Sequence, residues 1–156
     1  MAAFSRLGEH GAVWLALGAL GGSIDRPRRE RWRSAMATVG CAYALNTAVK
    51  LLVRRRRPSL PGLPALTSTP TALSFPSAHA ATSFAGALRY SRLGLPPAPL
   101  YALALALSAS RVYLGVHYPS DVIGGALLGT AVGRGLSPAA GARCGGAGGR
   151  AAQGSP

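Results

Sequence analysis

Acidic residues are scarce in this chain of 156 residues: it has four Asp and Glu against seventeen Lys and Arg, which gives a formal net charge of +13. So basic a chain suits an anionic partner, whether nucleic acid, anionic lipid or a phosphorylated substrate. The acids are dispersed along the sequence, at Glu9, Asp25, Glu30 and Asp121. Because hard divalent metals are held by several carboxylates, we expect neither a metal site nor a cofactor.

Cysteines and aromatic residues are also few. Cys41 lies in an apolar run and Cys144 in a glycine-rich tail, so the two cysteines do not suggest a disulfide scaffold. Aromatic residues make up 6% of the chain, and most arginines border apolar blocks. Because a soluble nucleic-acid binder interleaves its cations with aromatic side chains on an accessible face, nucleic acid is not an expected partner.

Hydrophobic residues, at 49%, gather in five blocks, which are 11–24, 35–53, 80–88, 99–109 and 122–132. Only the second block approaches the ~20 residues that span a bilayer as a helix. A soluble bundle, however, needs polar outer faces, which these blocks lack. The pattern predicts an all-α fold: a multi-span transmembrane bundle of about five helices in residues 1–136, followed by a disordered Gly/Ala-rich tail in 137–156.

The last block carries a stripe of small residues. Gly125, Gly129 and Gly133 recur every four residues, and Asp121 lies on the same stripe one turn earlier. Because small residues let two helices approach closely, we expect this face to pack directly against another helix.

Most of the unusual polar residues fall in three short stretches, and the first closes the second block. Lys50, Arg54 and Arg57 are at helical spacing, so we expect them on one helical face, with the helix ending at Pro58. Arginine offers a planar fork for two oxygens and lysine a compact charge, so this face suits a phosphoryl group. The alternative is an ordinary basic flank of a membrane helix.

The second stretch, residues 75–79, precedes the third block. Ser77 is placed to cap the following helix, whose first backbone N–H groups then form a site for an anion. His79 falls in the first turn, where it can donate or accept a proton near neutral pH. The alternative is a simple cap followed by an interfacial histidine.

The third stretch, residues 110–121, joins the fourth and fifth blocks. Asp121 follows His117 by four residues, close enough to accept the ring N–H and make the histidine a nucleophile or base. Arg111 adds a cation. The alternative is a turn in which Ser120 or Asp121 caps the last helix.

If every block crosses the membrane, the three stretches meet at one membrane face. The second and fourth blocks end on that side, and the third and fifth begin there. Two histidines, one aspartate, one lysine and several arginines then share a face, which is a set suited to phosphoryl transfer without a metal. The order of the blocks therefore predicts an active site at one face of the membrane.

These stretches resemble the signature of the type 2 phosphatidic acid phosphatase superfamily, which also includes bacterial acid phosphatases and vanadium haloperoxidases. Its pattern, whose spacings this sequence matches, is Lys, six residues and Arg-Pro; then Pro-Ser-Gly-His; then Ser-Arg, five residues, His, three residues and Asp. The matching residues are Lys50, Arg57 and Pro58, then Pro76, Ser77 and His79, then Ser110, Arg111, His117 and Asp121. The one departure is Ala78, which stands where the pattern has glycine.

The resemblance implies a role for the matched residues. His117 is the nucleophile, which passes through a phosphohistidine, Asp121 orients it, and His79 is the general acid for the leaving oxygen. The residues that bind the phosphoryl oxygens are Lys50, Arg57, Ser77 and Arg111. The small, arginine-rich chain looks like actinobacterial members that remove the 5-phosphate from decaprenylphosphoryl-5-phosphoribose for cell-wall arabinan synthesis. Phosphatidic acid and prenyl pyrophosphates are the alternative substrates.

Two questions stay open at this point, the class of protein and its orientation. A non-catalytic arginine-rich membrane protein that binds anionic lipid is the alternative of another class, and nothing in the sequence signals the halide chemistry of a haloperoxidase. Ten of the seventeen cations fall at the face opposite the three stretches. The positive-inside rule therefore predicts that the active site is extracytoplasmic, and the resemblance implies an integral protein of the bacterial plasma membrane.

Overall fold

The computed structural model describes residues 11–58, 69 and 71–135, where the regular structure is helical apart from one isolated bridge between Arg56 and Leu73. The helices are α2 (Ala12–Ile24), the 3-10 turn η2 (Arg26–Arg28), α3 (Arg29–Val53), α4 (Ala78–Ser91), α5 (Pro97–Tyr113) and α6 (Pro119–Gly135). Each predicted block forms one α-helix, so the all-α prediction is confirmed. The boundary predicted at residue 136 and the tail in 137–156 lie outside the described residues.

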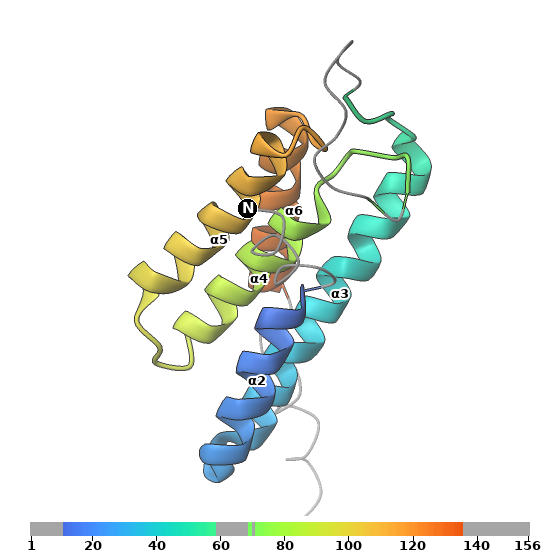
Figure 1. Ribbon diagram of the computed structural model, residues 1–156. Helices are drawn as coiled ribbons and strands as arrows, with labels where there is room; N and C mark the ends of the chain where they lie inside the picture. The colour runs from blue at the N-terminus through green and yellow to red at the C-terminus, as the bar shows by residue number, and fades with distance from the viewer. Residues whose placement is uncertain (1–10, 59–68, 70, 136–156) are drawn as a thin grey trace, which may run out of the picture.

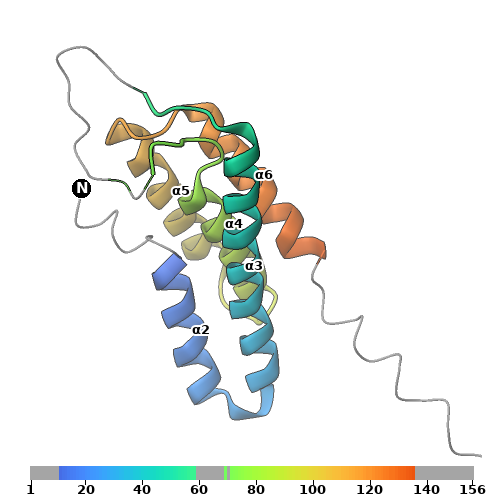
Figure 2. The same cartoon turned by 90° about the vertical axis from the view of Figure 1, so that its right-hand side faces the viewer.

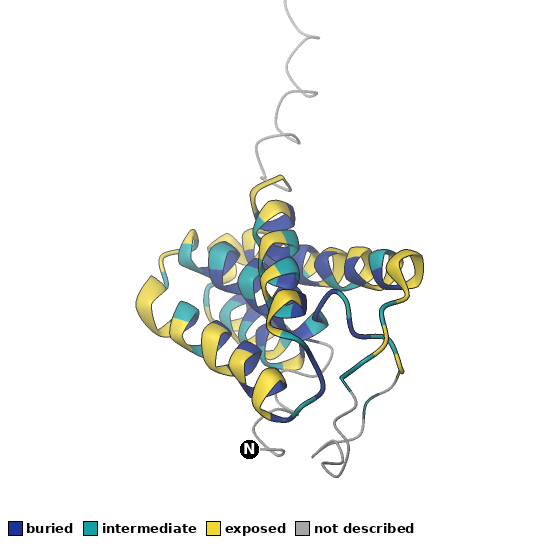
Figure 3. Ribbon diagram, turned by 90° about the horizontal axis from the view of Figure 1, so that it is seen from above, coloured by how far each residue is buried: buried dark blue, intermediate teal, exposed yellow. Residues whose placement is uncertain are grey.

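The helix α4 is the centre of the bundle. It packs against α3, α5 and α6, and Figure 1 shows it between α3 and α5 with α6 behind. Ten of its fourteen residues are buried, whereas the surrounding helices expose their outward faces (Figure 3). A helix enclosed in this way needs small side chains to pack densely, and eight of the fourteen residues of α4 are alanine, serine or glycine.

Aromatic residues tie α2, α3 and α4 together at the end where α3 begins and α4 ends. The rings of Trp14 and Trp32 stack on Tyr90, with centroids 6.3 and 5.7 Å away. The Tyr90 hydroxyl donates to the Trp14 carbonyl oxygen at 2.6 Å, and Trp14 Nε1 donates to Ser83 Oγ at 3.0 Å. These hydrogen bonds let the cluster bury large rings without leaving their polar atoms unsatisfied.

The glycine stripe of α6 packs against α4, as the sequence predicts. A methyl group at Gly125 would collide with the carbonyl oxygen of Ser77, and one at Gly129 with that of Ala81. Where this contact begins, the Ser77 backbone N–H donates to the Asp121 carbonyl oxygen at 2.9 Å. The backbone of α6 therefore touches the backbone of α4, at a separation that only glycine allows.

The arginine-rich segment 25–33, which lies between the first two apolar blocks, forms a turn and the start of a helix. Asp25 stabilises this turn, because its carboxylate pairs with Arg28 Nε at 2.7 Å and accepts a hydrogen bond from Trp32 Nε1 at 3.1 Å. Within the described residues, the resulting segment Arg26–Val53 is the one long and apolar enough to span a bilayer, while Ala12–Ile24 is apolar but shorter.

Gly129→Ala is expected to destabilise the bundle by about 1 to 3 kcal/mol, because the new methyl group overlaps the Ala81 backbone and forces α6 to shift. Gly40→Ala is the matched control. Gly40 is exposed on α3, and a methyl group there meets nothing within 4 Å, so helix propensity predicts a gain of roughly 0.5 to 1 kcal/mol. Thermal unfolding in detergent measures both variants; shifts of the same sign would contradict the close packing of α6 on α4.

Candidate active site

The segment after α3 departs from the predicted helix. α3 ends at Val53, and Arg54 turns the chain with a φ of 53°, while its backbone N–H donates to the Lys50 carbonyl oxygen at 3.0 Å. The prediction that Lys50, Arg54 and Arg57 share one helical face is therefore wrong. The helix does not reach Pro58 either, and the Arg54 side chain is exposed. A left-handed residue at a helix end satisfies the last carbonyl groups, and it releases the following arginines from the helix.

Arg57 reaches the site from an extended segment. Its backbone N–H donates to the Ala72 carbonyl oxygen at 3.2 Å, and its Nε donates to the Thr71 carbonyl oxygen at 2.8 Å. Its Nη1 donates to the Val116 carbonyl oxygen at 2.8 Å and lies 3.3 Å from Nε2 of His117. Because a guanidinium group has only donors, Nε2 is the acceptor in this contact, and the ring proton of His117 belongs on Nδ1.

Two further cations come from helix ends. Lys50 lies in the last turn of α3, is buried, and donates from Nζ to the Leu73 carbonyl oxygen at 3.4 Å. Arg111 lies in the last turn of α5 and is buried as well. Both interact electrostatically with His117, as Arg57 does. Three cations therefore surround one histidine.

The beginning of α4 supplies a cap and a second histidine. Ser77 is the N-cap and its Oγ accepts the Ala80 N–H at 3.5 Å, as predicted. His79 lies in the first turn, is buried, and interacts electrostatically with His117. Ala78 is the first residue of the helix and has no positive φ, so alanine in place of glycine is not strained there.

His117 and Asp121 lie at the centre of the site. Gly115, with a φ of 69°, turns the chain after α5 and brings His117 beside the fully buried Asp121. His117 Nδ1 is 3.4 Å from Asp121 Oδ2, a close contact without the alignment of a hydrogen bond. Oδ2 also accepts the Tyr118 backbone N–H at 2.8 Å, as the side chain of a capping box does. Asp121 therefore both stabilises the start of α6 and faces the histidine.

Burial and neighbouring cations keep His117 neutral. Burial lowers the pKa of His117 far below its ordinary value, and Arg57 and Lys50 lower it further. At neutral pH the lone pair of Nε2 is consequently available to an electrophile. Burial and then Arg111 lower the pKa of Arg57 to about 10, so Arg57 itself remains charged. The site combines a neutral histidine with surplus positive charge, which suits an incoming phosphoryl group.

The structure brings the predicted site residues to one end of the bundle, where α3 and α5 end and α4 and α6 begin (Figures 1 and 2, top). These residues are Lys50, Arg57, Ser77, His79, Arg111, His117 and Asp121. The roles that the resemblance implies for them stay predictions. Sequence reasoning missed Arg55, whose Nη1 donates to Asp121 Oδ1 at 3.0 Å. Arg55 lies within a run of four arginines. Only its position two residues before Arg57 could have distinguished it, because extended backbone sends every second side chain to the same side.

Comparison with known proteins agrees with this geometry. A model of the PAP2 superfamily matches residues 31–143. The chain is 47% identical over 130 residues to decaprenylphosphoryl-5-phosphoribose phosphatase of Mycobacterium tuberculosis, which covers 83% of this chain and 72% of that protein. The crystal structure of Aquifex aeolicus LpxE matches with a TM-score of 0.69 and 28% identity, over 85% of this chain and 79% of that chain. A transmembrane PAP2 type phosphatidylglycerolphosphate phosphatase from Bacillus subtilis matches with a TM-score of 0.70 and 26% identity, over 86% and 71%.

Ala78→Gly is expected to preserve the rate of phosphate release, because a helical first turn accommodates either residue. The free energy of unfolding should fall by less than about 1 kcal/mol, the difference in helix propensity between the two residues. Steady-state kinetics and thermal unfolding in detergent measure these effects. A loss of kcat greater than about tenfold would mean that the methyl group of Ala78 helps to shape the site.

Proposed function

The chain belongs to the PAP2 superfamily, and from this premise we propose that it is a metal-independent phosphatase that removes a phosphate from a lipid-linked phosphomonoester. One observation carries the proposal: three cations and a second histidine surround the buried His117 at one end of the bundle, with Asp121 behind it. The proposed substrate is decaprenylphosphoryl-5-phosphoribose, because a relative of that name is similar over most of both chains. The reaction then serves synthesis of the cell-wall arabinan.

In the first step of the proposed reaction, Nε2 of His117 attacks the phosphorus of the monoester. A nitrogen–phosphorus bond forms, the bond from phosphorus to the ester oxygen breaks, and His79 donates a proton to the leaving oxygen. Nδ1 of His117 faces Asp121 at 3.4 Å, so the carboxylate stabilises the positive charge that develops on the ring. The lipid-linked product leaves as an alcohol.

In the second step, water attacks the phosphohistidine. His79, now unprotonated, accepts a proton from that water while the nitrogen–phosphorus bond breaks. Inorganic phosphate leaves, Nε2 of His117 regains its lone pair, and His79 is again protonated for the next substrate. The cycle consumes one water molecule and restores both histidines.

The cations take the part that a metal ion plays in other phosphatases. Arg57 and Arg111 offer planar forks for pairs of phosphoryl oxygens, and Lys50 offers a point charge. Arg57 donates toward Nε2 of His117 at 3.3 Å. An arriving phosphoryl group attracts that guanidinium and leaves the nitrogen free to attack. Substrate binding therefore also activates the nucleophile.

We propose that all five α-helices cross the membrane, with α2, α3, α5 and α6 around the central α4. Their outward faces carry large apolar side chains, among them Leu20, Ile24, Leu52, Leu105, Ile123 and Leu127, each more than half exposed. The central α4, which lies entirely within the described residues, exposes no large apolar side chain. α5 and α6 have 17 residues each, which corresponds to about 26 Å of helix, close to the ~30 Å hydrocarbon core.

His117→Ala is expected to lower phosphate release by ~10³-fold or more, because the nucleophile is lost. His79→Ala should slow hydrolysis of an alkyl phosphate by ~10²- to 10⁴-fold and that of an activated aryl phosphate much less, because a good leaving group needs no proton. The assay uses protein in detergent, a panel of lipid phosphates and a chelator throughout. Cys41→Ser, an exposed change on α3, is the control that should leave activity unchanged.

Several outcomes of this assay contradict the proposal. Near-normal turnover by His117→Ala overturns the assignment of the nucleophile. Activity that disappears in chelator and returns with Mg²⁺ overturns the metal-free mechanism. Binding of anionic lipid without hydrolysis of any phosphate in the panel would identify an arginine-rich lipid-binding protein. A preference for phosphatidic acid or a prenyl pyrophosphate would replace the proposed substrate alone.

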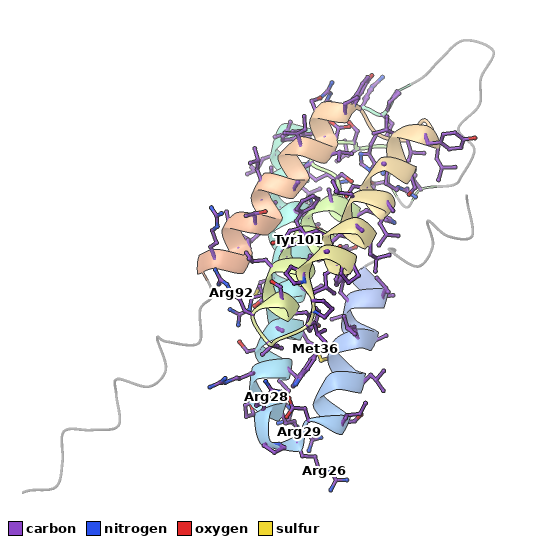
Figure 4. The ribbon with its side chains drawn as sticks, turned by 90° about the vertical axis from the view of Figure 1, so that its left-hand side faces the viewer. Arg26, Arg28, Arg29, Met36, Arg92 and Tyr101 are labelled. Carbon is purple, nitrogen blue, oxygen red and sulfur yellow. The ribbon has the colours of Figure 1, made fainter. Side chains whose placement is uncertain are left out.

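We also propose that the catalytic end faces away from the cytoplasm. The opposite end of the bundle carries Arg26, Arg28 and Arg29 on its surface (Figure 4, bottom). Cations of membrane proteins gather on the cytoplasmic side. Lys50, Arg57 and Arg111, at the catalytic end, are explained by phosphate binding and say little about orientation.

Cysteine labelling tests this orientation at two exposed positions, Thr71 at the catalytic end and Ser23 at the other. Each is changed to cysteine in a background that lacks Cys41 and Cys144. An impermeant thiol reagent applied to intact cells should label position 71 and miss position 23, and lysed cells should label both. The reverse pattern in intact cells would place the active site in the cytoplasm.

A further inference from the structure

Arg55 makes three contacts with the turn that begins α6. Its Nη1 donates to Asp121 Oδ1 at 3.0 Å and to Ser120 Oγ at 2.8 Å. Its guanidinium lies over the ring of Tyr118, 4.1 Å from the centroid. The side chain is 39% exposed, whereas that of Asp121 is fully buried. Arg55 therefore reaches from the edge of the site to the carboxylate beneath it.

These contacts divide the two oxygens of Asp121 between different partners. Arg55 binds Oδ1, while Oδ2 accepts the Tyr118 N–H at 2.8 Å and faces His117 Nδ1 at 3.4 Å. A carboxylate held at both oxygens cannot rotate about its terminal bond. Its Oδ2 is consequently kept toward the ring nitrogen that carries the proton.

We propose that Arg55 is a positioning residue for the hydrolytic reaction, which acts on His117 through Asp121 and does not bind the phosphoryl group. The proposal rests on the proposed function, in which His117 is the nucleophile. It assigns Arg55 a task different from that of Arg57, although only one residue separates them. Extended backbone sends alternate side chains to the same side, so both face the site, one toward the carboxylate and the other toward the histidine.

The other cations of the site show why Asp121 needs a fixed partner. Asp121 attracts Lys50 and Arg57 electrostatically, and Arg111 and His79 are the remaining charged or titratable groups around His117. Without Arg55, the Tyr118 N–H still holds Oδ2, but Oδ1 can turn toward Lys50 or Arg57 and take the carboxylate out of line with the imidazole. The same movement would neutralise cations that the substrate phosphate requires.

The neighbours of Arg55 provide matched controls. The Arg56 side chain is exposed and makes no hydrogen bond or ion pair with the described residues. Arg54 is exposed at the end of α3 and donates to the Leu51 carbonyl oxygen at 3.1 Å. Arg56→Gln removes one positive charge from the same segment without touching Asp121, so it should leave kcat unchanged.

Arg55→Gln is expected to lower kcat by about 10- to 100-fold, the usual effect of losing a group that orients a reactive residue, with KM changed by less than about threefold. The decisive measurement is a double-mutant cycle with Asp121→Asn. If Arg55 acts through Asp121, Arg55→Gln should cost nothing further in the Asp121→Asn background. The substrate is the best lipid phosphate of the panel, and rates are corrected for the folded fraction from thermal unfolding.

A conservative variant separates positioning from a structural role. Arg55→Lys keeps the charge but not the fork, so it should restore part of the kcat that Arg55→Gln loses, with KM unchanged. A merely structural role would lower the unfolding temperature and leave kcat, once corrected for the folded fraction, unchanged.

Three results would overturn the proposal. One is an unchanged kcat in Arg55→Gln. Another is an equal loss in the Asp121→Asn background, which would indicate direct contact with the phosphate. The third is a raised KM with kcat preserved. If Arg55→Gln fails to fold, Arg55→Lys carries the same double-mutant cycle. These results apply once the wild-type protein hydrolyses the substrate and His117→Ala does not. Failure of the proposed function is therefore distinguished from failure of the proposal for Arg55.

Discussion

The close contact of α6 with α4 is the constraint on which the site depends. α4 provides Ser77 and His79, and the turn into α6 provides His117 and Asp121. The glycines of α6 let the two backbones touch, and the Ser77 N–H bonds the Asp121 carbonyl oxygen at 2.9 Å. A contact between backbones cannot be relaxed by a change of rotamer. The relative position of the two histidines is therefore set by helix packing and not by the loops around them.

Surplus positive charge is the second constraint, and backbone carbonyl groups accept the hydrogen bonds of the cations. Buried cations need partners, yet Asp121 is the one acid among the site residues. Arg57 donates to the carbonyl oxygens of Thr71 and Val116, and Lys50 to that of Leu73. Carbonyl groups satisfy a donor without cancelling its charge. An incoming phosphate therefore meets cations whose hydrogen bonds can be exchanged but whose charge has not been neutralised.

The sequence was sufficient to predict the helices and to select residues that the structure brings to one end of the bundle, because apolar blocks and motif spacing are local signals. It failed at the end of α3, where a single left-handed residue, Arg54, stops the helix within a run that favours its continuation. That failure also concealed Arg55, since only the extended backbone after Arg54 brings it to Asp121. Helical spacing correctly grouped the glycines of α6, because no turn interrupts them. The errors therefore lie where backbone conformation, and not side-chain pattern, determines which residues meet.

A site that combines cations with a carboxylate must keep the two apart, and this requirement explains the arrangement around Asp121. Left free, the carboxylate would occupy the arginines and lysine that the phosphate needs. Here the Tyr118 N–H and Arg55 hold it on the side of the imidazole away from Arg57, which contacts the opposite ring nitrogen. His117 thus lies between its negative and positive neighbours, with the proton on Nδ1 and the lone pair on Nε2. Acidic residues are scarce in the whole sequence, and at the site their scarcity leaves the cations available to bind an anion.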